Sequence, residues 1–152
     1  MTNRSMDVAD AGTYAGNIVT SYLADTSVFE GGRISPLAYI DSNFVPGSFY
    51  AECVLFHEAS EGSPPEHSHD DFDEIVMFFG TDPERPHELC GEVEWWMGGE
   101  KYLLTQSCMI FVPKGLRHCP VYLRRVDRPI LNLSTGPSGS YRRDGIEQQP
   151  GT

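Results

Sequence analysis

The sequence has few basic residues, and this shortage limits the partners that it can bind. Of its 152 residues, 11 are Lys or Arg and 22 are Asp or Glu, giving a formal net charge of -11 at pH 7. Nucleic-acid phosphates are bound by clustered Lys and Arg and are repelled by a negative field. We therefore expect no nucleic-acid partner. The one basic concentration, which we interpret as solvated surface, comprises Arg124, Arg125, Arg128, Arg142 and Arg143.

Long apolar runs and paired cysteines are also missing. No apolar run approaches the roughly 20 residues that span a bilayer, and the first seven residues lack the apolar core of a signal peptide. We therefore expect no membrane partner and a cytoplasmic location. The cysteines form no C-x-x-C pair, which predicts free thiols. They are Cys53, Cys90, Cys108 and Cys119.

The sequence does contain a regular series of short strand-like segments separated by Gly and Pro. Segments of aromatic and β-branched residues predict strands, and this spacing is typical of an all-β sandwich or barrel. The length suits one domain, and the sequence contains no internal repeat. The predicted strands are 49–57, 75–79, 91–97, 101–105, 109–112, 118–124 and 130–134.

The two ends of the chain differ in composition from this β region. We assign an N-terminal arm to residues 1–35, the β domain to 36–136 and a tail to 137–152. Residues 1 to about 12 are polar and small and predict a mobile arm, whereas 14–23 could form a short helix or an arm strand. The tail is Pro, Gly, Ser, Arg and Gln without apolar spacing, which predicts disorder.

Three histidines and a carboxylate make the strongest chemical pattern. His67 and His69 are one residue apart, so on an extended segment their imidazoles point to the same face. An acidic pair, Asp73 and Glu74, follows shortly after, and His118 comes from a distant predicted strand. Together these groups would form a nitrogen and oxygen site suited to Fe, Mn, Ni, Cu or Zn. Cys119 would face away from such a site because neighbouring strand residues point to opposite faces.

These residues resemble the two motifs of the cupin superfamily. The resemblance implies a cupin β-barrel, also called a double-stranded β-helix or jelly roll, that holds one divalent transition metal. It assigns the ligands to His67, His69, Glu74 and His118. Asp73 competes for the carboxylate position because it lies at the family's usual distance from Gly80. Glu74 is favoured as the second acid of the pair before an apolar strand. The first motif is matched by Gly62, His67, His69, Glu74 and Gly80, and the second by Ser107, Pro113, Gly115 and His118.

Strand alternation predicts which side chains surround the metal. If Glu74 points inward, so do Val76 and Phe78, and if His118 points inward, so does Tyr122. This predicts a mostly apolar cavity with Tyr122 as the one phenol near the metal. We take Tyr122 and His57 as candidate proton carriers. The alternatives are a packed barrel tyrosine and a surface or core histidine.

Three functions are compatible with this site. The first is a metal-dependent dioxygenase, an oxidoreductase, since the four ligands resemble those of cupin dioxygenases acting on enols, diketones and flavonols. The second is a non-redox isomerase, cyclase, decarboxylase or lyase that uses the metal as a Lewis acid. The third is a small-molecule binding module without turnover. The complete ligand set favours an enzyme acting on a small enol, phenol or keto substrate.

The sequence also predicts a homodimer, because aromatic residues are abundant and single-domain members of the family that it resembles commonly form dimers.

Overall fold

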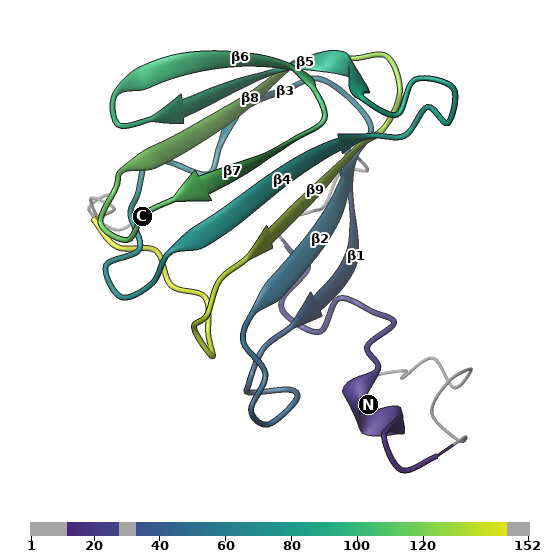
Figure 1. Ribbon diagram of the computed structural model, residues 1–152, viewed down its shortest axis with the longest axis vertical. Coiled ribbons are helices and arrows are strands. Elements are labelled where there is room, and N and C mark those ends of the chain that lie inside the picture. Colours follow the sequence, from purple (N-terminus) through teal and green to yellow (C-terminus); the bar gives the residue numbers. More distant parts are fainter. Residues whose placement is uncertain (1–11, 28–32, 146–152) are drawn as a thin grey trace.

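The computed structural model describes residues 12–27 and 33–145, which form two facing antiparallel sheets (Figure 1). One sheet has the strand order β1-β2-β9-β4-β7 and the other β3-β8-β5-β6. The first sheet comprises β1 (Ile34–Ile40), β2 (Ala51–Phe56), β9 (Ile130–Thr135), β4 (Glu74–Gly80) and β7 (Cys108–Val112). The second comprises β3 (Ser60–Ser63), β8 (His118–Val126), β5 (Glu88–Met97) and β6 (Glu100–Gln106), and a short 3-10 helix, η1 (Ala15–Asn17), precedes both.

The hydrophobic core lies between the two sheets. Along β4 the buried positions alternate, so Val76 and Phe78 point inward as predicted. Trp95 of β5 reaches across to Phe78, with ring centroids 6.1 Å apart. Burying a side chain of this size stabilises the fold by about 1.5–3 kcal/mol relative to leaving it exposed. The buried cluster comprises Val76, Phe78, Leu89, Val93, Trp95, Val112, Cys119, Leu123 and Ile130.

The all-β prediction is confirmed, and seven strands form at the predicted positions. The two strands that were not predicted, β1 and β3, both lie at the edge of a sheet. β1 contains Pro36, which lies next to a register shift in the pairing of β1 with β2. A proline within a segment argues against predicting it as a strand, because proline cannot donate a backbone hydrogen bond. β3 has the sequence Ser-Glu-Gly-Ser and carries no apolar residue. Both strands therefore owe their extended form to pairing with a neighbouring strand.

The N-terminal residues that the structure describes meet the first sheet at Tyr22, which pairs with Tyr39 of β1. Residues 14–23, for which helix and strand were both open, contain η1 and a single parallel bridge between Tyr22 and Tyr39. The predicted mobile arm falls mostly on residues 1–11, which lie outside the described residues. No helix within 12–27 or 33–145 is long and apolar enough to cross a membrane.

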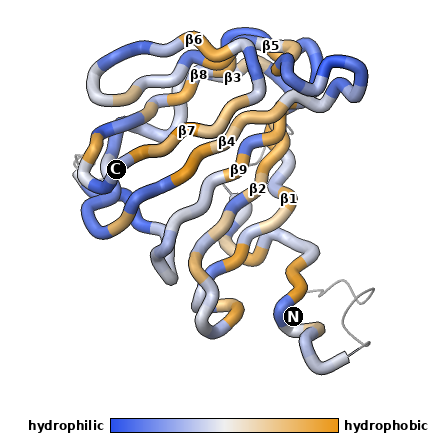
Figure 2. The backbone as a smooth tube through the Cα atoms, in the orientation of Figure 1, coloured by the Kyte–Doolittle hydropathy of each residue, from blue (hydrophilic) through white to orange (hydrophobic). Residues whose placement is uncertain are grey.

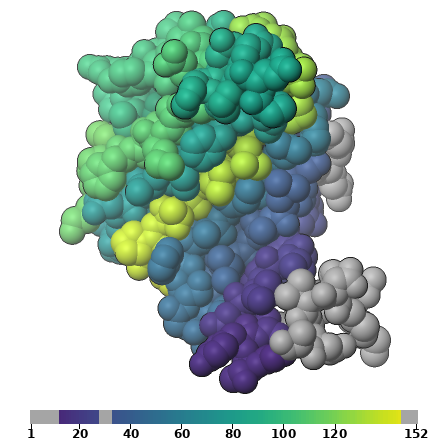
Figure 3. Space-filling model, turned by 45° about the vertical axis from the view of Figure 1, so that its right-hand side comes forward, coloured from purple at the N-terminus to yellow at the C-terminus, as the bar shows by residue number. Residues whose placement is uncertain are grey.

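The prediction of a disordered tail is wrong for residues 137–145. Tyr50 N donates to Ser138 O at 2.8 Å, Ser42 N donates to Gly139 O at 3.0 Å, and Ser68 and Asp144 exchange two backbone hydrogen bonds. Backbone groups make these contacts, so the polar composition could not indicate them. We call residues 136–145 the C-terminal strap. In Figure 3 the yellow-green chain that includes β9 runs between β4 and the blue strands β1 and β2. Residues 146–152 lie outside the described residues.

Candidate metal centre

Backbone pairing brings the three histidines together at the end of the barrel. His67 and His118 exchange backbone hydrogen bonds of 3.0 and 2.9 Å, which joins the segment before β4 to the start of β8. His69 lies two residues further along the same segment, and Glu74 is the first residue of β4. All four side chains are buried. Residues distant in sequence therefore converge on one enclosed point.

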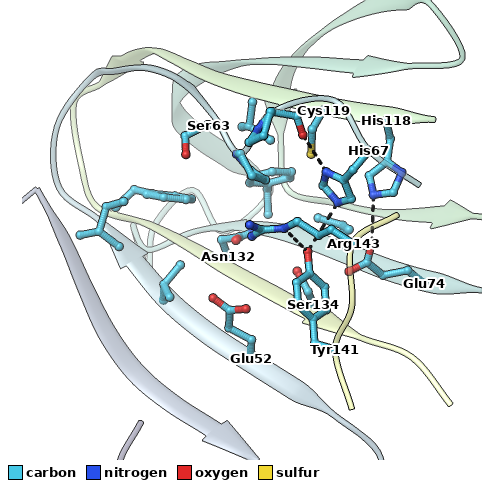
Figure 4. A pocket seen from close by; sticks show the side chains of 18 of the residues that line it. Glu52, Ser63, His67, Glu74, His118, Cys119, Asn132, Ser134, Tyr141 and Arg143 are labelled. Carbon is cyan, nitrogen blue, oxygen red and sulfur yellow. Dashed lines mark hydrogen bonds and ion pairs between the residues drawn. The ribbon is translucent and has the colours of Figure 1, made fainter. Parts of the chain in front are cut away.

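The ring nitrogens and the carboxylate lie within bonding reach of a single ion. One ring nitrogen from each of His67, His69 and His118 lies within 4.8 Å of the others. Glu74 Oε2 is 2.9 Å from His69 Nε2 and 3.2 Å from His118 Nε2. Figure 4 shows His67, His118 and Glu74 pointing toward one another at one end of a cavity.

The outer nitrogens of the three rings determine which nitrogen carries the proton. His67 Nδ1 lies 2.7 Å from the carbonyl of Pro65, His69 Nδ1 lies 2.6 Å from that of Arg142, and His118 Nδ1 lies 3.0 Å from that of Leu116. A carbonyl oxygen only accepts hydrogen bonds, so each Nδ1 is the donor. In a neutral ring the lone pair is then on Nε2, which is the arrangement of a metal-bound histidine.

With neutral rings, this arrangement gathers acceptors that need a cation between them. When the rings of His118 and His69 also carry a proton on Nε2, they donate hydrogen bonds to Glu74, which outweigh its burial and hold the pKa of its carboxyl at about 2. Burial lowers the pKa of His67 to about 4, so this ring is neutral at physiological pH. Burial also favours neutral His69, but the hydrogen bond and charge of Glu74 raise its pKa overall. A divalent metal would satisfy the carboxylate and the lone pairs together, so these residues fit the ion that the cupin motifs imply.

The structure places Glu74, and not Asp73, beside the histidines. Tyr50 donates a 2.9 Å hydrogen bond to Glu74 Oε1, which leaves Oε2 facing the rings. Asp73 is exposed, and its Oδ1 accepts a 2.9 Å hydrogen bond from the backbone N–H of Lys114. The assignment of His67, His69, Glu74 and His118 as ligands stays a prediction, and the geometry is consistent with it.

A cavity of about 480 Å³ extends from this centre between the sheets. Its apolar wall includes Val54, Val76, Phe78, Trp95, Val121 and Leu123. Several polar side chains also face it, as Figure 4 shows for most of them. The cavity is therefore more polar than the sequence predicted. These polar residues include Tyr22, Glu52, Asn132, Ser134, Tyr141 and Arg143.

Tyr122 does not line the cavity, so the prediction for this residue is wrong. Trp95 pairs with Val121 and Met97 pairs with His118, so β8 has one more residue than β5 between these two pairs. Such a bulge reverses the alternation of side chains beyond it. Tyr122 consequently lies under the guanidinium of Arg124, 4.3 Å from its ring centroid. Cys119, predicted to face away from the site, lines the cavity instead. Burial raises the pKa of its thiol to about 12, so it stays protonated.

His57 is also absent from the cavity wall. It follows the last residue of β2, and its Nε2 lies 2.7 Å from Ser35 Oγ. The structure therefore gives the ring a hydroxyl partner on β1 and does not bring it to the metal centre, which corrects its prediction as a catalytic candidate. It corresponds to the alternative of a satisfied structural histidine.

Three polar residues of the cavity were missed by the sequence analysis. Tyr141 of the C-terminal strap places its hydroxyl 3.5 Å from His67 Nε2, and Arg143 Nε donates to the same hydroxyl at 2.9 Å. Glu52 of β2 points into the cavity, and burial raises its pKa although Tyr22 and Arg143 act in the opposite sense. Alternation along β2 could have indicated Glu52, because it shares a face with Val54 and Phe56. The composition of the strap gave no comparable indication for Tyr141 and Arg143.

Comparison with known proteins adds the fold family. No protein-family model matches the sequence, and no curated protein matches it. Among solved structures, recombinant oxalate oxidase in complex with glycolate is 15% identical, with a TM-score of 0.56, over 86% of this chain and 63% of that chain. Peruvianin-I, a cysteine peptidase from Thevetia peruviana latex, is 12% identical, with a TM-score of 0.57, over 85% and 76%. An RmlC-like cupin from Shewanella frigidimarina NCIMB 400 is 19% identical, with a TM-score of 0.46, over 81% and 87%.

The two facing sheets, the paired histidine motifs and the likeness to the two structures with TM-scores above 0.5 identify the fold as the cupin fold. The chain spans less than two thirds of the length of the oxalate oxidase chain. The two neighbours with the higher TM-scores have different names and activities. The likeness therefore shows the fold alone, and function has to be argued from the site.

Proposed function

We propose that this chain is a metal-dependent enzyme that acts on a small organic substrate through an enol, phenol or keto oxygen. The observation that carries the proposal is the convergence of three buried histidines and Glu74 Oε2 at the end of a cavity. A buried set of acceptors without a cation is costly, because their charge and lone pairs are removed from water. The ion would be Fe, Mn, Ni, Cu or Zn, all of which accept imidazole and carboxylate ligands.

The size and lining of the cavity suit a small substrate that has one apolar side and several oxygen atoms. A volume of about 480 Å³ lies within the range of small-molecule sites. Phe78 and Trp95 offer aromatic surface, while Asn132 and Tyr141 offer hydrogen bonds. A bound divalent metal would act as a Lewis acid toward a substrate oxygen. The protein's own part is to orient the rest of the molecule and to move a proton.

Glu52 is the residue best suited to move that proton. It lines the cavity from β2, opposite the sheet that carries His118, and burial raises its pKa. A raised pKa makes a carboxyl a stronger base and brings its pKa closer to the pH at which an enzyme works, which favours proton transfer. This favours non-redox chemistry of the isomerase, cyclase, decarboxylase or lyase type. A dioxygenase is the second candidate, since its requirement for a metal with open positions is met by the same four ligands.

Proton exchange under anaerobic conditions tests the proposal. The Zn-loaded protein is incubated in D₂O with a panel of 2-keto acids and 1,3-diketones, and NMR follows exchange at the carbon next to the carbonyl. We expect exchange without oxygen, and a Glu52→Gln variant with unchanged zinc content to be slower by roughly two to four orders of magnitude. Exchange that is unaffected by this substitution would reject Glu52 as the proton carrier. Turnover seen only with Fe and oxygen would favour the dioxygenase.

A further inference from the structure

Arg143 differs from the other arginines that the structure describes. Its Nε donates to Tyr141 Oη at 2.9 Å, and its guanidinium points into the cavity (Figure 4). Within residues 12–27 and 33–145, no carboxylate oxygen forms an ion pair with it. Every other arginine in these ranges forms one: Arg33 with Glu58, Arg85 with Asp82, Arg117 with Glu66, Arg124 with Glu94, Arg125 with Asp127, Arg128 with Asp82 and Arg142 with Asp71.

The guanidinium is held in place by its neighbour in the strap. The ring of Tyr141 lies 5.2 Å below the Arg143 Cζ atom, and the Tyr141 hydroxyl accepts from Nε. The remaining four N–H groups of a guanidinium form a planar fork that matches the two oxygens of a carboxylate. Tyr141 therefore orients a charged fork whose outer donors have no carboxylate partner among the described residues.

The distance from this fork to the metal centre suits a small molecule. The Tyr141 hydroxyl is 2.9 Å from Arg143 Nε on one side and 3.5 Å from His67 Nε2 on the other. Two hydrogen-bond lengths thus separate the arginine from a predicted metal ligand. A molecule of four or five carbon atoms could place one oxygen at the metal and an anionic group at Arg143.

We propose that the substrate carries a carboxylate that binds Arg143, while its enol or keto oxygen binds at the metal centre. This inference rests on the proposed function and adds the substrate class. Glu52 also lines the cavity and interacts electrostatically with Arg143, and its negative form would favour a singly charged carboxylate over a doubly charged phosphate. The chain is strongly acidic overall, so Arg143 also supplies the local positive charge that an anion needs.

Matched ligands test the charge requirement. The probes are 4-oxopentanoate, which has a keto group and a carboxylate, and 4-oxopentanamide, which has the same skeleton without the charge. NMR titration of the Zn-loaded protein measures both affinities. Arg143→Gln should weaken the binding of 4-oxopentanoate by roughly ten- to a hundredfold, which is the loss expected for a charge-assisted pair. The same substitution should change the affinity for 4-oxopentanamide by less than about twofold. Arg143→Lys should give an intermediate affinity because charge is kept and the fork is lost.

Arg128→Gln is the control, because it removes the same charge from a side chain that does not line the cavity. It should leave both affinities unchanged. Zinc content and thermal melting of each variant confirm that the site is intact. Equal binding of 4-oxopentanoate by zinc-loaded wild type and Arg143→Gln would overturn the carboxylate inference and leave the metal proposal standing. A wild-type protein that binds no metal would overturn both.

Discussion

At the scale of single residues, the choice between Asp73 and Glu74 is the sharpest test of the site. Glu74 is buried against His69 and His118, whereas Asp73 is exposed and accepts from the backbone of Lys114. We expect Glu74→Gln to lose most of its metal after dialysis, because an anionic ligand becomes a neutral amide. Asp73→Asn is the matched control and should keep its metal. Elemental analysis by mass spectrometry measures both, and metal loss in Asp73→Asn alone would reverse the assignment.

Tyr122 offers a second residue-level test. Because the bulge in β8 turns it out of the cavity and under Arg124, removing its hydroxyl should have no effect on the site. We expect Tyr122→Phe to match wild type in metal content and in proton-exchange rate, within about twofold. Proton-exchange assays compare it with Glu52→Gln. A proton-exchange rate several hundredfold lower in Tyr122→Phe would show that this phenol lies in the cavity after all.

His67 should make the stability of the metal-free protein depend on pH. Its pKa is about 4 in the folded chain because of burial, against about 6.5 unfolded. Between these values the unfolded state binds more protons, so this residue costs stability as pH falls from about 6.5 to 4, by up to about 3 kcal/mol. His69, whose pKa is raised, acts in the opposite sense.

The contribution of His67 is isolated by comparing wild type with His67→Gln. Urea unfolding of chelator-treated protein at pH 7 and pH 4.5 gives the change in unfolding free energy for each. We expect the loss on acidification to be smaller in His67→Gln. Equal losses in the two proteins would show that His67 does not stay neutral through burial.

The sequence could indicate His67 and His69 because their spacing is local and strand alternation puts them on one face, and it could indicate His118 because that residue belongs to a second short motif that resembles the cupin pattern. It could not predict the position of Tyr122, because one extra residue in β8 reverses the alternation after His118. Arg143 was interpreted as solvated surface, since its place in the cavity depends on where the strap folds. Side chains that are oriented by long-range backbone contacts leave no periodic pattern to read.

At the scale of elements, the C-terminal strap is the part of the site with the fewest sequence indications. It brings Tyr141 and Arg143 to the cavity, and the carbonyl of Arg142 accepts from His69 Nδ1. Asp144 fixes its end, with Oδ2 accepting from Asp70 N at 3.0 Å and Oδ1 lying 3.1 Å from Arg142 Nε. The strap therefore supports both a predicted ligand and the predicted substrate contact.

Loosening the strap should lower stability by a measurable amount. Asp144→Ala removes one hydrogen bond and one ion pair, which we expect to cost about 1 to 2 kcal/mol and to lower Tm by roughly 2 to 8 °C. Asp127→Ala is the control, because the carboxylate of Asp127 forms an ion pair with Arg125 at the surface, and this substitution should shift Tm by about 1 °C or less. Differential scanning calorimetry compares the two. Equal shifts would mean that Asp144 does not anchor the strap.

Elements without apolar alternation were the ones that prediction missed. β4 carries buried residues at alternate positions and was predicted to within one residue at each end, while β5 is buried over most of its length and was predicted from residue 91 onward. The edge strand β3 is polar and largely exposed, and only its pairing with β8 makes it a strand. The strap is held by main-chain hydrogen bonds that any sequence could make and by the side chains of Asp144 and Arg142, whose partners are far away in the sequence. Apolar composition indicates which segments are buried, and these segments are mostly exposed, so composition did not indicate them.

At the scale of the whole molecule, the outer face of the five-stranded sheet is apolar. Ile75 pairs with Phe111 across β4 and β7, and both are exposed, as is Met109 at 67%. Figure 2 shows hydrophobic colour along β4 and β7. An exposed apolar surface of this kind is usually covered by a partner, so we expect a homodimer that buries this face.

A charge placed on this face tests the dimer. Phe111→Asp should convert the protein to a monomer, because a carboxylate would be buried without a partner in the interface. Leu103→Asp, an exposed residue of β6 in the other sheet, is the control and should stay dimeric. Light scattering coupled to size exclusion reads the mass. A wild-type monomer over a wide concentration range would contradict the expectation.

The central claim is that His67, His69, Glu74 and His118 hold one divalent metal. X-ray absorption spectroscopy of the purified protein at the edge of its bound metal tests it most directly. We predict about one metal per chain, surrounded only by nitrogen and oxygen at about 2.0 to 2.2 Å, with imidazole scattering that is lost when the histidines are replaced. A sulfur neighbour at about 2.3 Å would instead assign Cys119 as a ligand. That result, or a protein that binds no metal, would contradict the account.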